Sequence, residues 1–391
     1  MNKAFFFLFF SLFIGQSQAQ QAVIRSPFVK MDTTNTIHQQ ISETLDSLFT
    51  QISTGKLDEQ YISSDHRQMT YSLLKSLQRY EVKKDSVASA LNDKQLIQLY
   101  PINDDQYSLS VTYMRPRKET DATLLYILHL MATKEQGVIR FGVPLDYLTR
   151  HWATTKIGKT TYYHRNKLNT KRAQIFNQKN EDIATRFGLE AEAFDFYLCD
   201  DYQEILKLRG IQYSATLNGR YRDGYGVVDS KIFAIMNNED FSHDLFHYYS
   251  GKINERANRN WITEEGLAYS WGNAYYTDPN GEMITHPRLV EELKAYLTDN
   301  QEASLWQLFE ANTKIFNHLA PEISVRSTIS GIIANEVERQ KGMKGIQQLI
   351  NSGRKDRVNS YMKAVEDLLG INRDNFDERV SYLLDKYELN R

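Results

Sequence analysis

The residues best suited to chemistry lie in the stretch Ser242–Trp271, which reads SHDLFHYYSGKINERANRNWITEEGLAYSW. Residues four apart on a helix share one face, so the imidazoles of His243 and His247 can bind the same ion. An acidic pair, Glu264 and Glu265, follows on a second predicted helix. A carboxylate from that helix would complete the three protein ligands of a catalytic zinc site and leave one position for water.

Composition excludes several other classes of function. The chain has 391 residues and a formal net charge of −2, so no basic surface field is available to attract nucleic acid or anionic lipid. Cys199 is the only cysteine, which excludes a disulfide framework and a thiolate metal site. We interpret Cys199 as a small buried apolar residue.

The N-terminus has the pattern of a secretory signal peptide. An apolar run with six phenylalanines covers residues 4–15, and Ser17-Gln18-Ala19 is a small-x-small cleavage site. We therefore predict a signal peptide at residues 1–19 and export to the periplasm or the extracellular medium. The run is too short to cross a bilayer, and no other stretch approaches the roughly 20 apolar residues that a membrane helix needs. No integral membrane segment is expected after signal removal.

Residues 20–154 are predicted to form a small α+β domain. Apolar residues at spacings of three and four indicate helices at residues 31–57, 69–77 and 85–91, the first behind the cap candidates Asp32, Thr33 and Thr34. The period then changes to two, which predicts antiparallel strands at residues 95–100, 107–115, 123–133 and 137–143. This order is loosely similar to nuclear-transport-factor-like domains. We expect a binding or spacer role.

Residues 155–391 are predicted to form a second domain with a short sheet and a mostly helical C-terminal half. A helix at 166–187 ends at Gly188, and strands follow at 194–199 and 232–236. We expect the histidine helix to be capped by Asn237 or Asn238, with the acids that follow in its first turn, and to end at Gly251. Further helices are expected at 287–297, 305–309, 325–340, 345–350, 358–369 and 376–387.

The pair of motifs HDLFH and WITEEGLA resembles the HExxH…WxxEGxA signature of gluzincin metallopeptidases. This group includes aminopeptidase N and many bacterial proteins of the peptidase MA-like type. The resemblance covers residues 162–391 and implies a thermolysin/aminopeptidase-type domain.

The resemblance implies a role for each matching residue. His243, His247 and Glu265 would hold one Zn²⁺ ion, and Glu264 is the alternative ligand if the register differs by one residue. Asp244 occupies the position of the general base, which accepts a proton from the attacking water. The strand at 232–236 would be the edge strand along which a peptide lies extended.

Two positions depart from the family pattern. Asp244 stands where the family has glutamate, which shortens the side chain by one methylene and retracts the carboxylate by about 1.5 Å. Thr328 stands where many members have a tyrosine that stabilises the oxyanion, a loss that typically costs about 10²–10³-fold in rate. Arg326, His318 and Tyr276 are the candidate replacement donors.

Three functional readings follow from these residues. The favoured one is an exported zinc-dependent peptidase that acts on a peptide or protein substrate. The second is a catalytically weakened or inactive relative that binds peptides or a protein partner, and the departures at Asp244 and Thr328 favour it. The third is a phosphohydrolase of the HD type, prompted by the adjacent pair His243-Asp244. The predicted strands and the unused tryptophan-glutamate-glycine segment disfavour this third reading.

Overall fold

The computed structural model describes residues 22–32, 34–81, 93–118, 121–219, 224–274, 277–355 and 357–387. The predicted signal peptide, the helix predicted at 85–91 and Tyr276 lie outside these residues. The chain forms two compact units. Unit 1 contains Met1–Gly142 and Tyr213–Thr216, and unit 2 contains Val143–Gln212 and Leu217–Arg391. The division falls between Gly142 and Val143, whereas the sequence pattern predicts it after residue 154.

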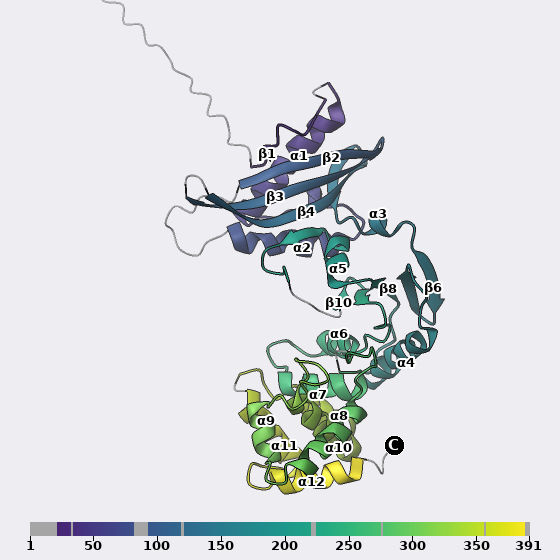
Figure 1. Ribbon diagram of the computed structural model, residues 1–391, viewed down its shortest axis with the longest axis vertical. Coiled ribbons are helices and arrows are strands. Elements are labelled where there is room, and N and C mark those ends of the chain that lie inside the picture. The colour runs from purple at the N-terminus through teal and green to yellow at the C-terminus, as the bar shows by residue number, and fades with distance from the viewer. Residues whose placement is uncertain are drawn as a thin grey trace, which may run out of the picture. The chain divides into compact units, whose positions relative to one another are not determined.

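Unit 1 combines two main helices with an antiparallel meander (Figure 1). Its helices are α1 (Thr36–Thr54), the 3₁₀ helix η1 (Glu59–Tyr61) and α2 (Arg67–Glu81). Its strands are β1 (Ile24–Arg25), β2 (Asp93–Asn103), β3 (Gln106–Lys118), β4 (Asp121–Glu135) and β5 (Val138–Gly142), paired in that order. A segment from later in the chain, β9 (Ile211–Ser214), pairs with β4. The strands predicted from the period-two pattern are confirmed.

Helix α1 buries the apolar face that its sequence predicts. Ile41, Leu45, Leu48 and Ile52 are fully or almost fully buried, as their spacing requires. The helix is capped by Asn35, whose side-chain oxygen accepts a hydrogen bond of 2.9 Å from the backbone N–H of Ile37. The predicted caps at residues 32–34 were therefore placed too early.

Unit 2 begins with α3 (Leu145–Thr149) and a five-stranded mixed sheet. The sheet contains β6 (Ala153–Ile157), β7 (Thr160–His164), β8 (Phe194–Cys199), β10 (Gly224–Val228) and β11 (Lys231–Ile235), in the order β10-β11-β8-β7-β6. Strand β10 runs antiparallel to β11 and covers its outer side. The prediction that residues 232–236 form the edge strand is therefore wrong, and β10 holds that place among the described residues.

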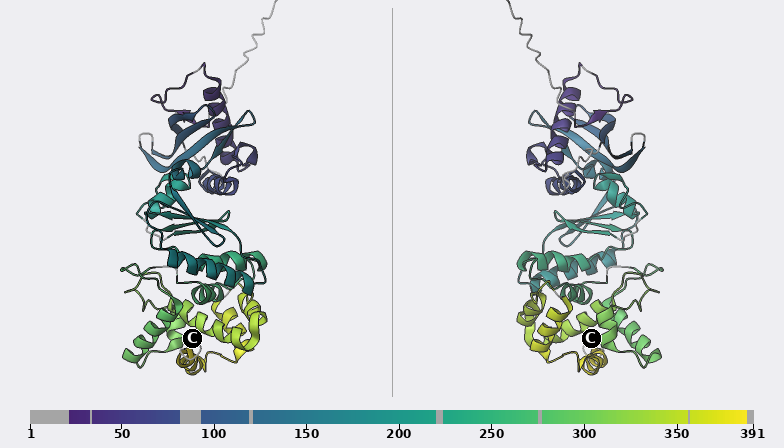
Figure 2. Two further views of the ribbon diagram at one scale, coloured as in Figure 1. Left: turned by 90° about the vertical axis from the view of Figure 1, so that its right-hand side faces the viewer. Right: turned by 90° about the vertical axis from the view of Figure 1, so that its left-hand side faces the viewer.

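Helices α4 (Thr170–Arg186) and α5 (Tyr202–Leu208) pack on this sheet. Helix α4 packs on it through Phe176, whose ring lies 5.1 Å from that of Phe196 in β8. Helix α5 contacts β8, β10 and β11. Figure 2 shows α4 lying along the sheet, with the helices of the C-terminal half beyond it. This packing positions the elements that support the helix carrying His243 and His247.

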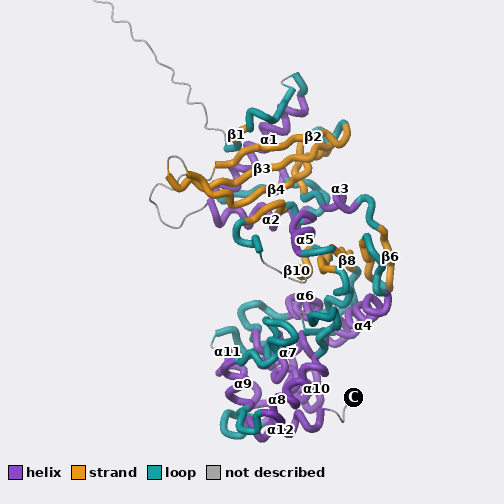
Figure 3. The backbone as a smooth tube through the Cα atoms, viewed as in Figure 1, coloured by secondary structure: helices purple, strands orange, loops and turns teal. Residues whose placement is uncertain are grey.

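The rest of unit 2 is helical, as Figure 3 shows. It contains α6 (His243–Ile253), α7 (Trp261–Trp271), α8 (His286–Asp299), α9 (Leu305–Ala311), α10 (Val325–Ile350), α11 (Arg357–Leu369) and α12 (Phe376–Lys386). Helix α10 contains a break at Gly342 with a φ of 59°, which separates the two helices predicted at 325–340 and 345–350. The α+β class is confirmed. Among the described residues, none of these helices has the length and apolarity needed to cross a bilayer.

The histidine helix starts later than predicted. Asn237 has a left-handed φ of 70°, and α6 begins at His243. Asp240 accepts a hydrogen bond from Lys179, and Glu239 accepts one from the backbone N–H of Asn169. These two carboxylates are thus used in tertiary contacts, which explains why they do not form a first helical turn.

Candidate metal centre

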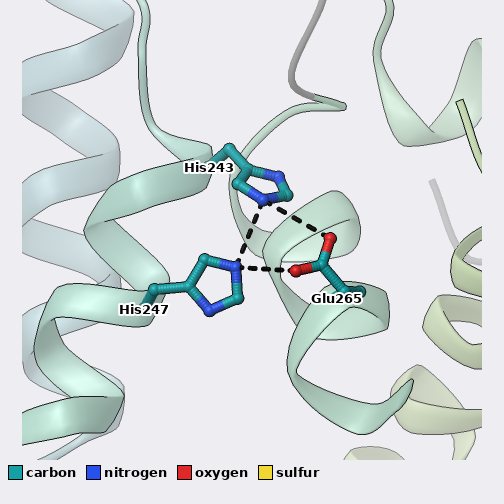
Figure 4. A group of neighbouring side chains, drawn as sticks. All are labelled: His243, His247 and Glu265. Carbon is teal, nitrogen blue, oxygen red and sulfur yellow. Dashed lines mark hydrogen bonds and ion pairs between the residues drawn. The ribbon is translucent and has the colours of Figure 1, made fainter. Parts of the chain in front are cut away.

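Two helices bring His243, His247 and Glu265 together (Figure 4). Helix α6 carries the histidines one turn apart, and α7 carries the glutamate. The Nε2 atoms of the histidines are 3.2 Å apart. Glu265 Oε1 lies 3.2 Å from Nε2 of His247, and Glu265 Oε2 lies 3.6 Å from Nε2 of His243. Of the two acids proposed as ligands, Glu265 is the one beside the imidazoles.

These separations fit the donor geometry of a small tetrahedral ion. Ligand atoms about 2.0–2.2 Å from a tetrahedral zinc lie about 3.3–3.6 Å from one another. Two of the side chains are also partly accessible to solvent, since His247 is 19% exposed and Glu265 is 17% exposed. The group could therefore hold a metal ion with a further position open to a small molecule.

The ring of His243 is oriented by a buried carbonyl. Its Nδ1–H donates a hydrogen bond of 3.1 Å to the backbone oxygen of Asn273, which leaves Nε2 with its lone pair facing Glu265. The side chain of Asn273 hydrogen-bonds Asp240. Lys179 binds the same carboxylate at 2.7 Å and the backbone oxygen of Gly272 at 3.0 Å. A charged network thus holds the carbonyl that selects the metal-binding tautomer.

The protonation states of the metal-free centre are set by burial and by Glu265. Burial lowers the pKa of His243 to about 4, so this imidazole is neutral at neutral pH. Burial also disfavours the charged form of His247, but the hydrogen bond and negative charge of Glu265 outweigh it and raise the pKa. The two imidazoles in turn hold the pKa of Glu265 below its usual range despite its burial. A cation at this place would therefore compete with a proton for His247.

Asp244 lies against the edge strand. A Cβ atom added at Gly226 in β10 would lie 3.1 Å from both Cγ and Oδ1 of Asp244, so the carboxylate packs tightly against this glycine. Its Oδ2 is buried and has no hydrogen-bond partner among the described residues. Burial raises the pKa of the Asp244 carboxyl to about 6 in the metal-free chain.

Glu264 points to a different part of the unit. Its Oε1 accepts hydrogen bonds from Ser250 Oγ at 2.6 Å and from Arg259 at 3.2 Å. These contacts hold α7 against the end of α6.

Arg326 and His318, the two described oxyanion-donor candidates, are engaged elsewhere. Arg326 donates to the backbone oxygens of Phe309 and Glu310. His318 lies at the surface, 3.1 Å from Glu292. The hydroxyl of Thr328 donates to the backbone oxygen of Ser324 within its own helix. None of these three side chains contacts the His-His-Glu group, and Tyr276 lies outside the described residues.

Helix α7 is held in place by very close packing on α10. A Cβ atom at Gly266 would lie 2.6 Å from Ser330 Oγ and 2.8 Å from the backbone nitrogen of Gly331. The small residues beside Glu265 therefore allow the two helices to approach closely, as the sequence predicts. Because Glu265 precedes Gly266 directly, this contact also fixes the position of the Glu265 carboxylate along α7.

Several contributors to the centre escaped sequence reasoning. Trp261 stacks on His247, with the ring centroids 5.4 Å apart and the planes 6° apart. The sequence indicates Trp261 only as part of the WITEEGLA motif, and nothing in it indicates the orientation of the indole ring. Lys179, Asp240 and Asn273 are separated by long stretches of chain, and no local pattern joins them.

No known protein family matches the chain, and no curated protein is significantly similar to it.

Proposed function

We propose that the chain is an exported, zinc-dependent peptidase that hydrolyses peptide or protein substrates. The observation that carries this proposal is the triangle of ligand atoms from His243, His247 and Glu265, with edges of 3.2, 3.2 and 3.6 Å. Two imidazoles and one carboxylate form a donor set that zinc uses in hydrolases. The short resemblance to the gluzincin signature supports the same reading.

Each part of the proposed site has a role in the chemistry. A bound zinc ion would supply Lewis acidity that activates water near neutral pH. Asp244, next to His243 in the sequence, would accept the proton of that water and pass it to the leaving amine. Strand β10 is the outermost described strand beside Asp244, so an extended peptide could pair with its edge.

A second candidate is a catalytically weakened or inactive relative that binds peptides or a protein partner. Two observations favour it. Oδ2 of the short Asp244 side chain is buried without a hydrogen-bond partner among the described residues. Arg326 and His318, the described donor candidates, are both engaged away from the His-His-Glu group.

A cleavage assay separates the two candidates. The mature chain, loaded with zinc, is incubated with a peptide library and compared with Asp244→Ala and Asp244→Glu. If the chain is a peptidase, the wild type cleaves peptides. The cleavage rate of Asp244→Ala is then at least about 10²-fold lower, because the general base is gone. If the wild type cleaves nothing while Asp244→Glu is active, the chain is an inactive relative of a peptidase and the first proposal is wrong.

A further inference from the structure

A cavity of about 310 Å³ opens beside the start of helix α7 in unit 2. Its lining consists of Arg256, Arg259, Trp261, Glu264, Arg354 and Arg357. Four of these six residues are arginines, and we call the space the arginine cavity. Trp261 is 50% exposed, and Arg256, Arg354 and Arg357 are also exposed, so a solute can reach its walls.

The fold itself brings the arginines together. They lie on two segments that are far apart in sequence, residues 254–261 and residues 350–355 with Arg357, and backbone hydrogen bonds join the two. The backbone nitrogen of Asn260 donates to Ile350 at 2.7 Å, and that of Gly353 donates to Asn258 at 3.0 Å. The buried side-chain amide of Asn260 also donates to the backbone oxygens of Gly353 and Arg357, both at 3.0 Å. The like charges are therefore held close by a rigid framework.

These charges are poorly compensated within the described part of the chain. The one lining carboxylate, Glu264, already accepts hydrogen bonds from Ser250 and Arg259. No described carboxylate forms an ion pair with Arg256, Arg354 or Arg357. The buried Nε of Arg259 has no hydrogen-bond partner in the same residues. Helices α7 and α11 also begin here, and their N-terminal dipoles add positive potential.

The arginine cavity adjoins the metal centre through one aromatic ring. Trp261 lines the cavity, and its indole stacks on the imidazole of His247 with a centroid distance of 5.4 Å. Arg259 approaches the end of α6, since a Cβ atom at Gly251 would lie 3.5 Å from its Nη1. The same indole therefore borders the arginine cavity and contacts one of the candidate metal ligands.

We propose that the arginine cavity binds a carboxylate of the peptide that occupies the metal centre. The guanidinium group forms paired hydrogen bonds with carboxylates, and such charge-assisted bonds are the stronger ones in proteins. The carboxylate belongs either to an acidic side chain or to the free C-terminus of the substrate. This inference rests on the proposed function in taking a peptide as the ligand, and it assigns that peptide an anionic group near the bond to be cleaved.

Peptide binding tests the proposal without requiring turnover. Fluorescently labelled peptides of one sequence carry either glutamate or glutamine at one position, and either an acid or an amide C-terminus. Their affinities for the zinc-loaded full chain bearing Asp244→Asn, which blocks cleavage, are measured by anisotropy. We expect at least one of the two carboxylates to tighten binding about tenfold, and the two arms identify which. Binding weakens with added salt.

Variants of exposed arginines complete the test. Arg354→Gln and Arg357→Gln should each remove most of the preference for the carboxylate, while Arg379→Gln, an exposed arginine on α12, should keep it. Equal affinity for all peptides, or an unchanged preference in both cavity variants, overturns the proposal. Cleavage by the wild type without any carboxylate preference also overturns it and leaves the peptidase standing. An arginine-dependent preference in a chain that cleaves nothing supports the cavity and contradicts the hydrolytic function.

Discussion

At the residue scale, the side chains of the centre differ in how well they are partnered. The two histidines have hydrogen-bonding or ionic partners, whereas one oxygen of Asp244 has none among the described residues. His243 and His247 are neighbours on one helical face, and each imidazole has a hydrogen-bonding or ionic partner on α7 or in the segment after it. Asp244 differs, because its carboxylate is buried against Gly226 and one oxygen lacks a partner among the described residues. The fold therefore orients the candidate metal ligands more fully than it orients Asp244, the proposed base.

The burial of Asp244 predicts a stability gain on removing its charge. Burial raises its pKa in the folded metal-free chain from 3.8, the ordinary value of an aspartate, to about 6, so folding penalises the ionised form. The stability contributed by the neutral form is fully present below about pH 4 and is lost as the pH rises through about 6. We expect Asp244→Asn to stabilise the metal-free chain by about 1–3 kcal/mol at pH 8 and by little at pH 4.

Urea unfolding of chelator-treated protein at the two pH values checks this expectation. Asp299→Asn, at an exposed position, is the matched control and should change stability by no more than about 0.5 kcal/mol. An Asp244→Asn effect that is the same at both pH values would contradict the assignment.

At the element scale, the second prediction concerns the contact between α7 and α10. Gly266→Ala would place a Cβ atom 2.6 Å from Ser330 Oγ, so one helix must move. We expect a loss of about 1–3 kcal/mol in stability and weaker zinc binding, because Glu265 moves with the helix. Gly251→Ala in α6 is the control. Its nearest neighbour would be an Arg259 nitrogen at 3.5 Å, and greater helix propensity should leave stability unchanged or raised. Calorimetry and zinc titration of both variants decide the matter.

A third prediction concerns the segment that orients His243. Asp240→Asn removes the charge that Lys179 and Asn273 share and loosens the carbonyl that accepts the Nδ1–H of His243. We expect zinc affinity to fall about 10–100-fold, as for other groups that orient metal ligands. Competition with a chromophoric chelator measures it. Unchanged affinity in a folded variant would show that the network serves stability alone.

The elements themselves were largely predictable from the sequence, because their signals are local. The period-two run in unit 1 and the helical run from α8 to α12 match the structure. Strands β6, β7 and β10 were missed because each has only five residues, too few for a clear period-two pattern. The start of α6 was misplaced for a different reason, since it depends on carboxylates bound by Lys179 and Asn169, which are distant in sequence. The spacing of the candidate metal ligands could be predicted from the sequence. The stacking of Trp261 on His247 and the position of Arg326 could not, because both depend on the tertiary structure.

At the scale of the whole molecule, the metal centre belongs entirely to unit 2. A ligand that binds only the folded state stabilises it, by about 2.7 kcal/mol at a concentration 100 times its Kd. We therefore expect zinc to raise the melting temperature of the chain, and the rise to vanish in His247→Ala. Thermal denaturation with and without zinc tests this, and a rise that survives in the variant would point to metal bound elsewhere.

We propose that one zinc ion lies between His243, His247 and Glu265. The most direct test is anomalous diffraction at the zinc absorption edge from crystals of the mature chain grown with zinc. We expect an anomalous peak about 2.0–2.2 Å from a side-chain nitrogen of each histidine and from a carboxylate oxygen of Glu265. Absence of a peak at this place, or a zinc peak held by other residues alone, would contradict it.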